Sequence, residues 1–256
     1  FMTFQVFGAI NKKVAEANKT TDDEWSFKYF ETNAAGSGPY MINTYDPENG
    51  IVLVPNPGYW DAANVKNTKV TVLAVPDASQ RALLLQKGEL DLADGLPPKM
   101  VTDLVSDPNV KVYKSVSSGV NYLAMNVGVK PFDNQAFRQA ILYAVPYEGI
   151  ISGVMYGFAA PANGVVSTSM ETYDVAIGAG YKTDLEMAKK KLLESKVDVS
   201  KLTIPIAVRE SRLDDQAAAV LIQDGLRAIG VNVEVQILPD GDFATKQNAN
   251  ELPLQI

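Results

Sequence analysis

The sequence predicts an α/β protein made of two halves joined by an extended segment. A strand, a helix and a second strand follow one another over residues 69–95, and the same order returns over residues 201–238. Between them, the stretch SSGVNYLAMNV at residues 117–127 connects the halves. A helix that connects two strands usually places them parallel, with a right-handed crossover. We therefore expect parallel strands in both halves.

The first elements are helical turns and a polar loop, followed by the glycine-rich AAGSGPY at residues 34–40. A phosphate-binding loop would follow a strand and open a helix. Here Pro39 leads into the strand-like YMINTY, so we interpret the glycines as a turn that feeds a strand. The turn DPENG then separates two apolar runs, which predicts a β-hairpin.

The predicted unit at residues 69–95 begins with the strand KVTVLAV. Asp77 and Gln80 have the spacing of a capping box, and Gly88 is a natural residue to follow the helix end. The segment ELDLADG should form the second strand. A short helix, MVTDLVSD, and a strand, VKVYKSV, follow at residues 100–107 and 110–116.

The second half begins with a helix at residues 134–145. Thr183 and Glu186 are spaced as a capping box for a helix at residues 184–195. The last unit comprises a strand at 201–208, a helix at 213–229 that ends before Gly230, and a strand at 231–238. Two predicted buried stripes follow helical spacing: Phe137, Ala140, Ile141 and Ala144 in one helix, and Ala218, Leu221, Ile222 and Gly225 in the other.

Composition restricts the possible functions. The chain of 256 residues has 46% hydrophobic and 21% charged residues, a formal net charge of −7, and no histidine or cysteine. The negative charge argues against non-specific nucleic-acid binding. Missing imidazole and thiol groups exclude the usual zinc, copper and iron ligands and the Ser-His and Cys-His pairs. No apolar run reaches the length of a membrane span, and we expect both ends to be cut from a longer chain.

Three residues are candidates for ligand contacts. Asp94 and Arg209 follow predicted strands, and ligands of open α/β sheets bind beyond the carboxyl ends of strands. Arg209 is suited to bind a carboxylate, although a surface pair with Glu210 or Asp214 is the favoured alternative. Tyr122 lies in the segment that joins the halves, where small-molecule sites often form.

Paired carboxylates leave a hydrolase open as a second hypothesis. Asp91, Asp94 or Glu210 would then act as acid and base. Asp214 and Asp215 fit better as first-turn residues that favour the helix dipole.

Seven motifs together resemble the periplasmic solute-binding proteins of family 5, the oligopeptide- and dipeptide-binding type, from about Ala9 to the end. They occur in the family's order and spacing: GSGPY at 36–40, NPGYW at 56–60, PDASQRALLLQKGELDLADGLPP at 76–98, NYLAMNV at 121–127, PFDNQAFRQAILYAV at 131–145, GFAAPANGVVS at 157–167 and IGVNVEVQIL at 229–238.

The resemblance implies a two-lobed, type II periplasmic-binding-protein fold, each lobe a mostly parallel sheet flanked by helices and incomplete at both ends. Residues 1–118 would belong to lobe one, with a helical and loop segment to about residue 35. Residues 119–127 would form the hinge and residues 128–256 the first part of lobe two.

The resemblance also implies a function. The protein would capture a small solute, a peptide by preference, in the cleft between its lobes and deliver it to an inner-membrane ABC permease. It would be periplasmic, monomeric, non-catalytic and without cofactor or metal. The expected ligand-binding residues are Tyr122, Met125 and Asn126 at the crossover, with Asp94, Leu96 and Arg209 approaching from the two lobes.

Two departures from the family pattern qualify this expectation. The family commonly has Ile-Asp-Arg where this chain has Val145, Pro146 and Tyr147, and metal capture through histidine is not available in this segment. An opine or a sugar remains an alternative solute. A chain that binds nothing because half of its cleft is missing is a further alternative.

Overall fold

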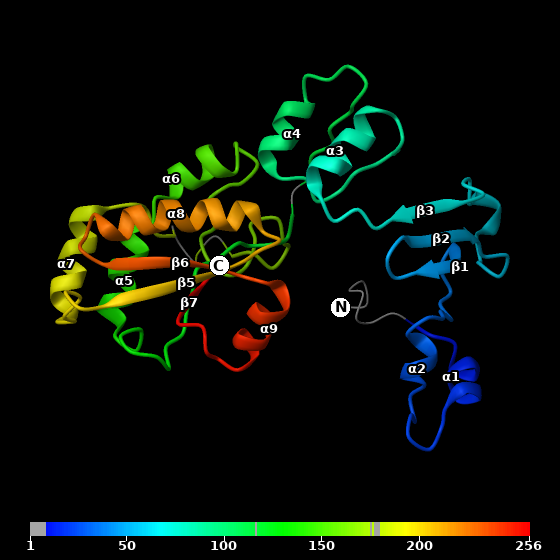
Figure 1. Cartoon of the computed structure of the whole chain (residues 1–256), viewed down its shortest axis with the longest axis horizontal. Coiled ribbons are helices and arrows are strands. Elements are labelled where there is room, and N and C mark those ends of the chain that lie inside the picture. The colour runs from blue at the N-terminus through cyan, green and yellow to red at the C-terminus, as the bar shows by residue number, and fades with distance from the viewer. Residues whose placement is uncertain (1–8, 116, 175, 177–179) are drawn as a thin grey trace. The chain divides into compact units, whose positions relative to one another are not determined.

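A computed structural model describes residues 9–115, 117–174, 176 and 180–256. The chain forms two compact units, residues 1–81 and 82–256, and each is described by itself (Figure 1). The boundary between them falls within helix α3 (Ala78–Gln86). The predicted division into residues 1–118, 119–127 and 128–256 stays a prediction.

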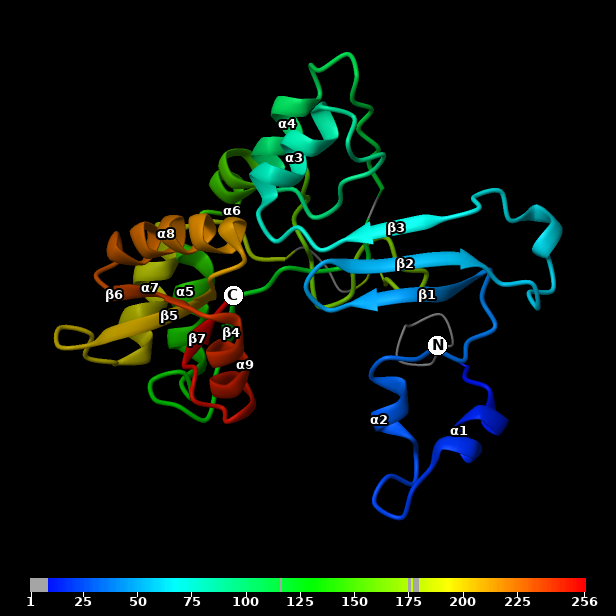
Figure 2. The ribbon, with the colours of Figure 1, turned by 45° about the vertical axis from the view of Figure 1, so that its right-hand side comes forward.

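The first unit holds two short helices and a sheet of three antiparallel strands. Strands β1 and β2 form the predicted hairpin, and β3 pairs with the other edge of β2 (Figure 2). Residues 38–40 turn directly into β1, as predicted for the glycine-rich segment. The elements are α1 (Lys12–Asn18), α2 (Phe27–Phe30), β1 (Tyr40–Asp46), β2 (Gly50–Pro55), the 3₁₀ turn η2 (Ala62–Asn64) and β3 (Val70–Leu73).

The hairpin turn is closed by Asp46. Its Oδ1 accepts hydrogen bonds from the backbone N–H groups of Glu48 and Asn49 at 2.9 and 3.2 Å. Gly50 has a φ of 123°, and a side chain there would collide with the carbonyl oxygen of Val72 on β3. A glycine is therefore required where the turn enters β2.

The predicted parallel unit over residues 69–95 is wrong, and with it the mostly parallel sheet expected for the first half. β3 pairs with β2 in an antiparallel register, and residues 89–95 form no strand. Gly88 and Gly95 both have positive φ, and Leu92 is 76% exposed. Alternating leucines resemble a strand, but turns at both ends bound the segment, and it joins neither sheet. Residues 110–115 likewise form no strand, and residue 116 of that prediction lies outside the described residues.

The second unit contains a sheet of four strands in the order β4-β7-β5-β6. β5 and β6 are parallel over seven residue pairs, which confirms the second strand–helix–strand prediction. β7 runs parallel to β5, and β4 is antiparallel to β7. Its elements are α4 (Pro98–Leu104), β4 (Ala124–Met125), α5 (Gln135–Ala144), α6 (Tyr147–Gly149), the π-helical turn η3 (Ile150–Val154), α7 (Leu185–Ser195), β5 (Thr203–Arg209), α8 (Leu213–Arg227), β6 (Asn232–Leu238), α9 (Asp240–Asn248) and β7 (Leu254–Gln255).

The main core lies on one face of this sheet, which α8 follows along its length (Figure 1). The predicted stripe of α5 is completely buried there, and it packs with Ile204, Ile206 and Val208 of β5 and with Ile222 and Leu226 of α8. On the opposite face, Ala207 of β5 packs with Phe243 of α9 and with Leu252. Helix α9 therefore covers the second face.

Helix α8 buries a face that is close to the predicted one. Ala218 and Ile222 are buried and Leu221 and Gly225 half-buried, while Ala219 and Leu226 are buried as well. Gly225 lies so close to the end of α5 that an added Cβ would collide with the carbonyl oxygen of Ala144.

One predicted helix cap is wrong. Asp184, not Thr183, caps α7, since its Oδ1 accepts a hydrogen bond from the N–H of Met187 at 2.8 Å. The Thr183 hydroxyl donates instead to the carbonyl of Val145 at 2.6 Å. Asp77 does cap α3, with its Oδ1 2.7 Å from the N–H of Gln80.

The protein is therefore an α/β molecule with one antiparallel and one mixed sheet. Among the residues that the structure describes, none of the helices combines the length and the apolar character needed to cross a bilayer.

Candidate functional site

Polar side chains gather at the carboxyl end of β5, on the face of the sheet that α9 covers. Successive side chains of a strand point to opposite faces, so Ala207 and Arg209 share this face. Gln255 of β7 pairs with Ala207 and therefore lies on the same face, next to them. This is the edge of the sheet at which ligands of α/β folds bind.

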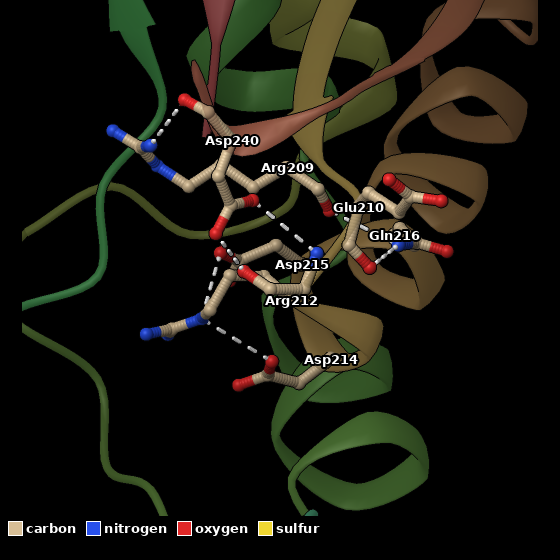
Figure 3. Close-up of polar contacts among 8 residues, drawn as sticks. Arg209, Glu210, Arg212, Asp214, Asp215, Gln216 and Asp240 are labelled. Carbon is tan, nitrogen blue, oxygen red and sulfur yellow. Dashed lines mark hydrogen bonds and ion pairs between the residues drawn. The ribbon is translucent and has the colours of Figure 1, made fainter. Parts of the chain in front are cut away.

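Arg209 is held loosely by neutral groups. Its Nη1 donates to the carbonyl of Asp240 at 3.4 Å (Figure 3). Its Nη2 donates to Oε1 of Gln247, also at 3.4 Å. These bonds are longer than the roughly 2.9–3.0 Å typical of N–H···O bonds. The guanidinium Cζ lies 4.1 Å from the ring centroid of Phe243, in cation–π geometry. Arg209 forms no ion pair in the described part of the chain, so the predicted pair with Glu210 or Asp214 is wrong.

Arg212 is the second cation of the site. Its Nε lies 3.3 Å from Oδ2 of Asp215 and 3.6 Å from Oδ1 of Asp214, the two acidic residues of the first turn of α8. Burial raises the pKa of the Asp215 carboxyl, Arg212 opposes this rise, and Asp214 adds to it. Both aspartates pair with Arg212. Arg209 is therefore the cation of the site that has no carboxylate in contact.

Asp240 connects the start of α9 to the loop after β5. The Ser211 hydroxyl donates to its Oδ2 at 2.7 Å, and the Ser211 N–H lies 3.4 Å from Oδ1 (Figure 3). Hydrogen bonding from the Ser211 hydroxyl holds the pKa of Asp240 below its ordinary value. Gln216 fixes the other side of this loop, donating to the carbonyls of Arg209 and Glu210 at 3.0 and 2.9 Å.

Arg209, Arg212 and Asp215 line a cavity of about 220 Å³. It has two cationic side chains, one carboxyl, and apolar walls. The lining residues are Val120, Asn121, Tyr122, Arg209, Arg212, Asp215, Phe243, Gln247, Gln255 and Ile256. A more open hollow of about 560 Å³ in the first unit is lined by only four residues of one loop, 19–24, and collects no comparable set of groups.

The structure brings some of the predicted site residues together. Tyr122, 67% exposed, and Arg209 line the same cavity. Asn126 lies four residues beyond Tyr122, and its Nδ2 donates to the carbonyl of Asn250 at 2.9 Å. Met125 pairs with Leu254 and packs against the main core.

The remaining two predicted residues lie elsewhere in the second unit. Asp94 is exposed, and its Oδ1 accepts a hydrogen bond from the N–H of Gly95 at 2.7 Å. Leu96 is half-buried, and neither residue lines the cavity. Their role in binding stays a prediction.

Eight lining residues were not among the predicted site residues: Val120, Asn121, Arg212, Asp215, Phe243, Gln247, Gln255 and Ile256. Phe243 and Gln247 come from a helix that the sequence analysis did not identify. The spacing of Phe243 and Gln247, one helical turn apart after Pro239, was the available signal. No cluster of three or more acidic side chains suited to a metal ion occurs among the described residues.

The comparison with protein families settles the classification. The sequence model described as "Bacterial extracellular solute-binding proteins, family 5 Middle" matches residues 2–256. The chain belongs to this family of extracellular solute-binding proteins.

Family 5 proteins are the solute-binding components of ABC transporters and are not enzymes, so the hydrolase hypothesis is not retained. The chain is 27% identical over 229 residues to the probable D,D-dipeptide-binding periplasmic protein DdpA of Escherichia coli (strain K12), covering 89% of this chain and 43% of that protein. It is 34% identical over 135 residues to the glutathione-binding protein GsiB of the same organism, covering 53% and 26%.

Solved family 5 structures have the same fold. The periplasmic binding protein DppA of Helicobacter pylori, in complex with the peptide STSA, superposes with a TM-score of 0.80 at 26% identity, covering 96% of this chain and 46% of that one. A dipeptide-binding protein of Pseudoalteromonas sp. SM9913 gives a TM-score of 0.79 at 22% identity, over 96% and 48%. The chain thus spans less than half the length of these relatives.

Proposed function

We propose that the protein containing this chain is the substrate-binding component of a bacterial ABC importer, and that it binds a peptide or peptide-like solute by its carboxylate. The observation that supports this most strongly is the loosely held Arg209 guanidinium at the carboxyl end of β5. Arginine recognises a carboxylate through two parallel N–H···O bonds, and these are stronger than bonds between neutral groups.

The environment of Arg209 favours this role. The guanidinium Cζ lies over the Phe243 ring, 4.1 Å from its centroid, and this contact helps to hold the group at the cavity. Of the charged side chains that line the cavity, Arg212 pairs with Asp215, and Arg209 is left to receive one carboxylate. A neutral sugar would leave the Arg209 charge uncompensated, which makes it the less favoured solute.

The size of the cavity indicates how much of the solute enters. Ligand pockets usually measure roughly 300–1,000 Å³. A cavity of about 220 Å³ is smaller, so we expect it to hold the carboxylate-bearing end of the solute. Tyr122 would cover this end, and the backbone near Met125 and Asn126 would contact the rest of the solute.

The remainder of the proposal concerns the whole protein. Residues 1–118 and 128–256 would belong to two lobes joined by the hinge at 119–127, with Asp94 and Leu96 reaching the solute from lobe one. The solute would stabilise the closed form because only that form lets both lobes contact it. The closed receptor would act in the periplasm and present its solute to an inner-membrane permease.

The first prediction concerns Arg209 and is tested by calorimetry on the full-length protein. We expect Arg209→Met to weaken binding of a carboxylate-bearing peptide by about tenfold or more, since a charge-assisted hydrogen bond contributes about 1.5–3 kcal/mol. The matched control is Arg227→Met, which removes an exposed arginine that pairs only with Asp224 on the same helix. Equal affinity of both variants would contradict the assignment of Arg209.

A further inference from the structure

The cavity contains a buried hydrogen-bond acceptor that no group of the described structure satisfies. Oε1 of Gln255 is shielded from solvent and accepts no hydrogen bond. A buried amide oxygen without a donor is unfavourable, by roughly 1–3 kcal/mol. Gln255 lines the same cavity as Arg209 and Arg212, so a rotation of its side chain would turn Oε1 from its shielded position toward a donor on a bound solute.

The position of Gln255 is fixed by the sheet. Gln255 pairs with Ala124 of β4 on one side and with Ala207 of β5 on the other. The backbone N–H of the next residue, Ile256, donates to the carbonyl of Ala207 at 3.1 Å. Its neighbour Leu254 is completely buried in the main core. Because strand residues alternate, this anchoring of Leu254 directs Gln255 to the opposite face, where Arg209 lies.

We propose that Gln255 accepts a hydrogen bond from an N–H group adjacent to the carboxylate of the solute. The cavity then recognises the terminal residue of a peptide, whose amide N–H and carboxylate are separated by one carbon. An anion that carries no N–H beside its carboxylate leaves Oε1 unsatisfied. This inference rests on the proposed carboxylate binding by Arg209.

Charge identifies the donor as an amide and not an ammonium group. Two of the three charged side chains that line the cavity are arginines, and they repel a second cation near the carboxylate. The carboxyl of Asp215, which would attract an ammonium group, is occupied by Arg212 at 3.3 Å. A neutral acceptor matches a neutral donor, so the preferred end is that of an acylated amino acid, as in the last residue of a peptide.

The experiment compares two ligand pools on the full-length protein. One is an equimolar pool of tripeptides that end in alanine, and the other is the same pool with the terminal alanine replaced by lactate, which substitutes an ester oxygen for the N–H. Retention is measured by native mass spectrometry, and the affinity of the best-retained pair by calorimetry. We expect wild type to bind the amide form about tenfold or more tightly than the ester, since ester and Gln255 oxygens would face each other.

Gln255→Leu supplies the decisive variant, because it removes the acceptor and leaves the side-chain volume similar. We expect it to bind the ester at least as tightly as wild type does and to lose the preference for the amide. Gln135→Leu, which changes an exposed glutamine at the start of α5, should keep the preference. An ester affinity in Gln255→Leu that is no lower than that of wild type also shows that the variant is folded.

Each outcome has a distinct meaning. Equal wild-type affinity for amide and ester would overturn the role of Gln255 while leaving carboxylate binding by Arg209 intact. A preference that survives in Gln255→Leu would overturn it as well. Retention of neither pool would refute the proposed peptide-binding function, and the inference would fall with it.

Discussion

Burial and ion pairing have opposite effects on the pKa of the Asp215 carboxyl. It is buried in the first turn of α8 with Arg212 as its partner, yet the pKa of its carboxyl is raised because desolvation outweighs the attraction of that arginine. A carboxyl whose pKa is higher in the folded than in the unfolded protein ionises at a cost to the folded state. The cost is absent below the unfolded pKa, near 3.8, and fully present above the raised value.

The second prediction follows from the raised pKa of Asp215, which makes its ionisation unfavourable in the folded protein. At pH 7 we expect Asp215→Asn to unfold at the same or a higher urea concentration than wild type, despite the lost ion pair. The difference should disappear as the pH falls below the ordinary aspartate range, where both side chains are neutral. Asp224→Asn, at an exposed position paired with Arg227, is the control. A clearly lower midpoint for Asp215→Asn at pH 7 would show that the ion pair dominates.

Single residues also show why the site was only partly predictable. The rule that ligands bind beyond the carboxyl ends of strands selected Arg209 correctly as a cavity residue. The sequence neighbours Glu210 and Asp214 suggested an ion pair, but Asp214 lies near Arg212 instead. Local spacing shows which residues are near in the chain, whereas the direction of a side chain depends on the strand face.

At the scale of elements, the close approach of α8 and α5 has a direct consequence for stability. Gly225 of α8 faces the carbonyl of Ala144, and its nearest side-chain atom is Cδ of Pro146, which an added Cβ would approach to 3.3 Å. A backbone carbonyl and a proline ring cannot easily move aside to make room for a side chain at position 225. The packing of the two helices therefore depends on the absence of a side chain at this position.

The third prediction uses two helical glycines. Gly225→Ala should lower the free energy of unfolding by about 1–3 kcal/mol, the usual cost of overpacking. Gly241→Ala in α9 places its Cβ in open space and should stabilise the protein by up to about 1 kcal/mol through helix propensity. Both values are obtained from urea denaturation. If Gly225→Ala were as stable as Gly241→Ala, the close helix packing would be incorrect.

The elements that the sequence predicted well are those with strong internal patterns. The stripe of α5 and the order β5, α8, β6 were confirmed because helical and strand periods extend over many residues. The strand expected at residues 89–95 did not form, although β3 is an edge strand of its sheet, because turns with positive φ at Gly88 and Gly95 bound this segment. Helix α9 was missed, and with it Phe243 and Gln247, because its short polar sequence has only one buried residue.

At the scale of the whole molecule, the central idea is a receptor that closes on its solute. The chain spans 43% of DdpA and 46% of the Helicobacter pylori DppA chain, so the proposed closing motion has to be tested on the full-length protein. The fourth prediction is that a saturating peptide lowers the radius of gyration measured by X-ray scattering, because the closed form is more compact. An unchanged radius with the site fully occupied would contradict hinge closure.

The claim of binding without catalysis is tested most directly by the fate of the bound peptide. The full-length protein is incubated with the alanine-terminated tripeptide pool, separated from free ligand, and denatured, and the released molecules are identified by mass spectrometry. We predict one intact peptide per protein molecule, with no cleavage products even after long incubation. Accumulating fragments, or no retained peptide, would contradict the proposed receptor.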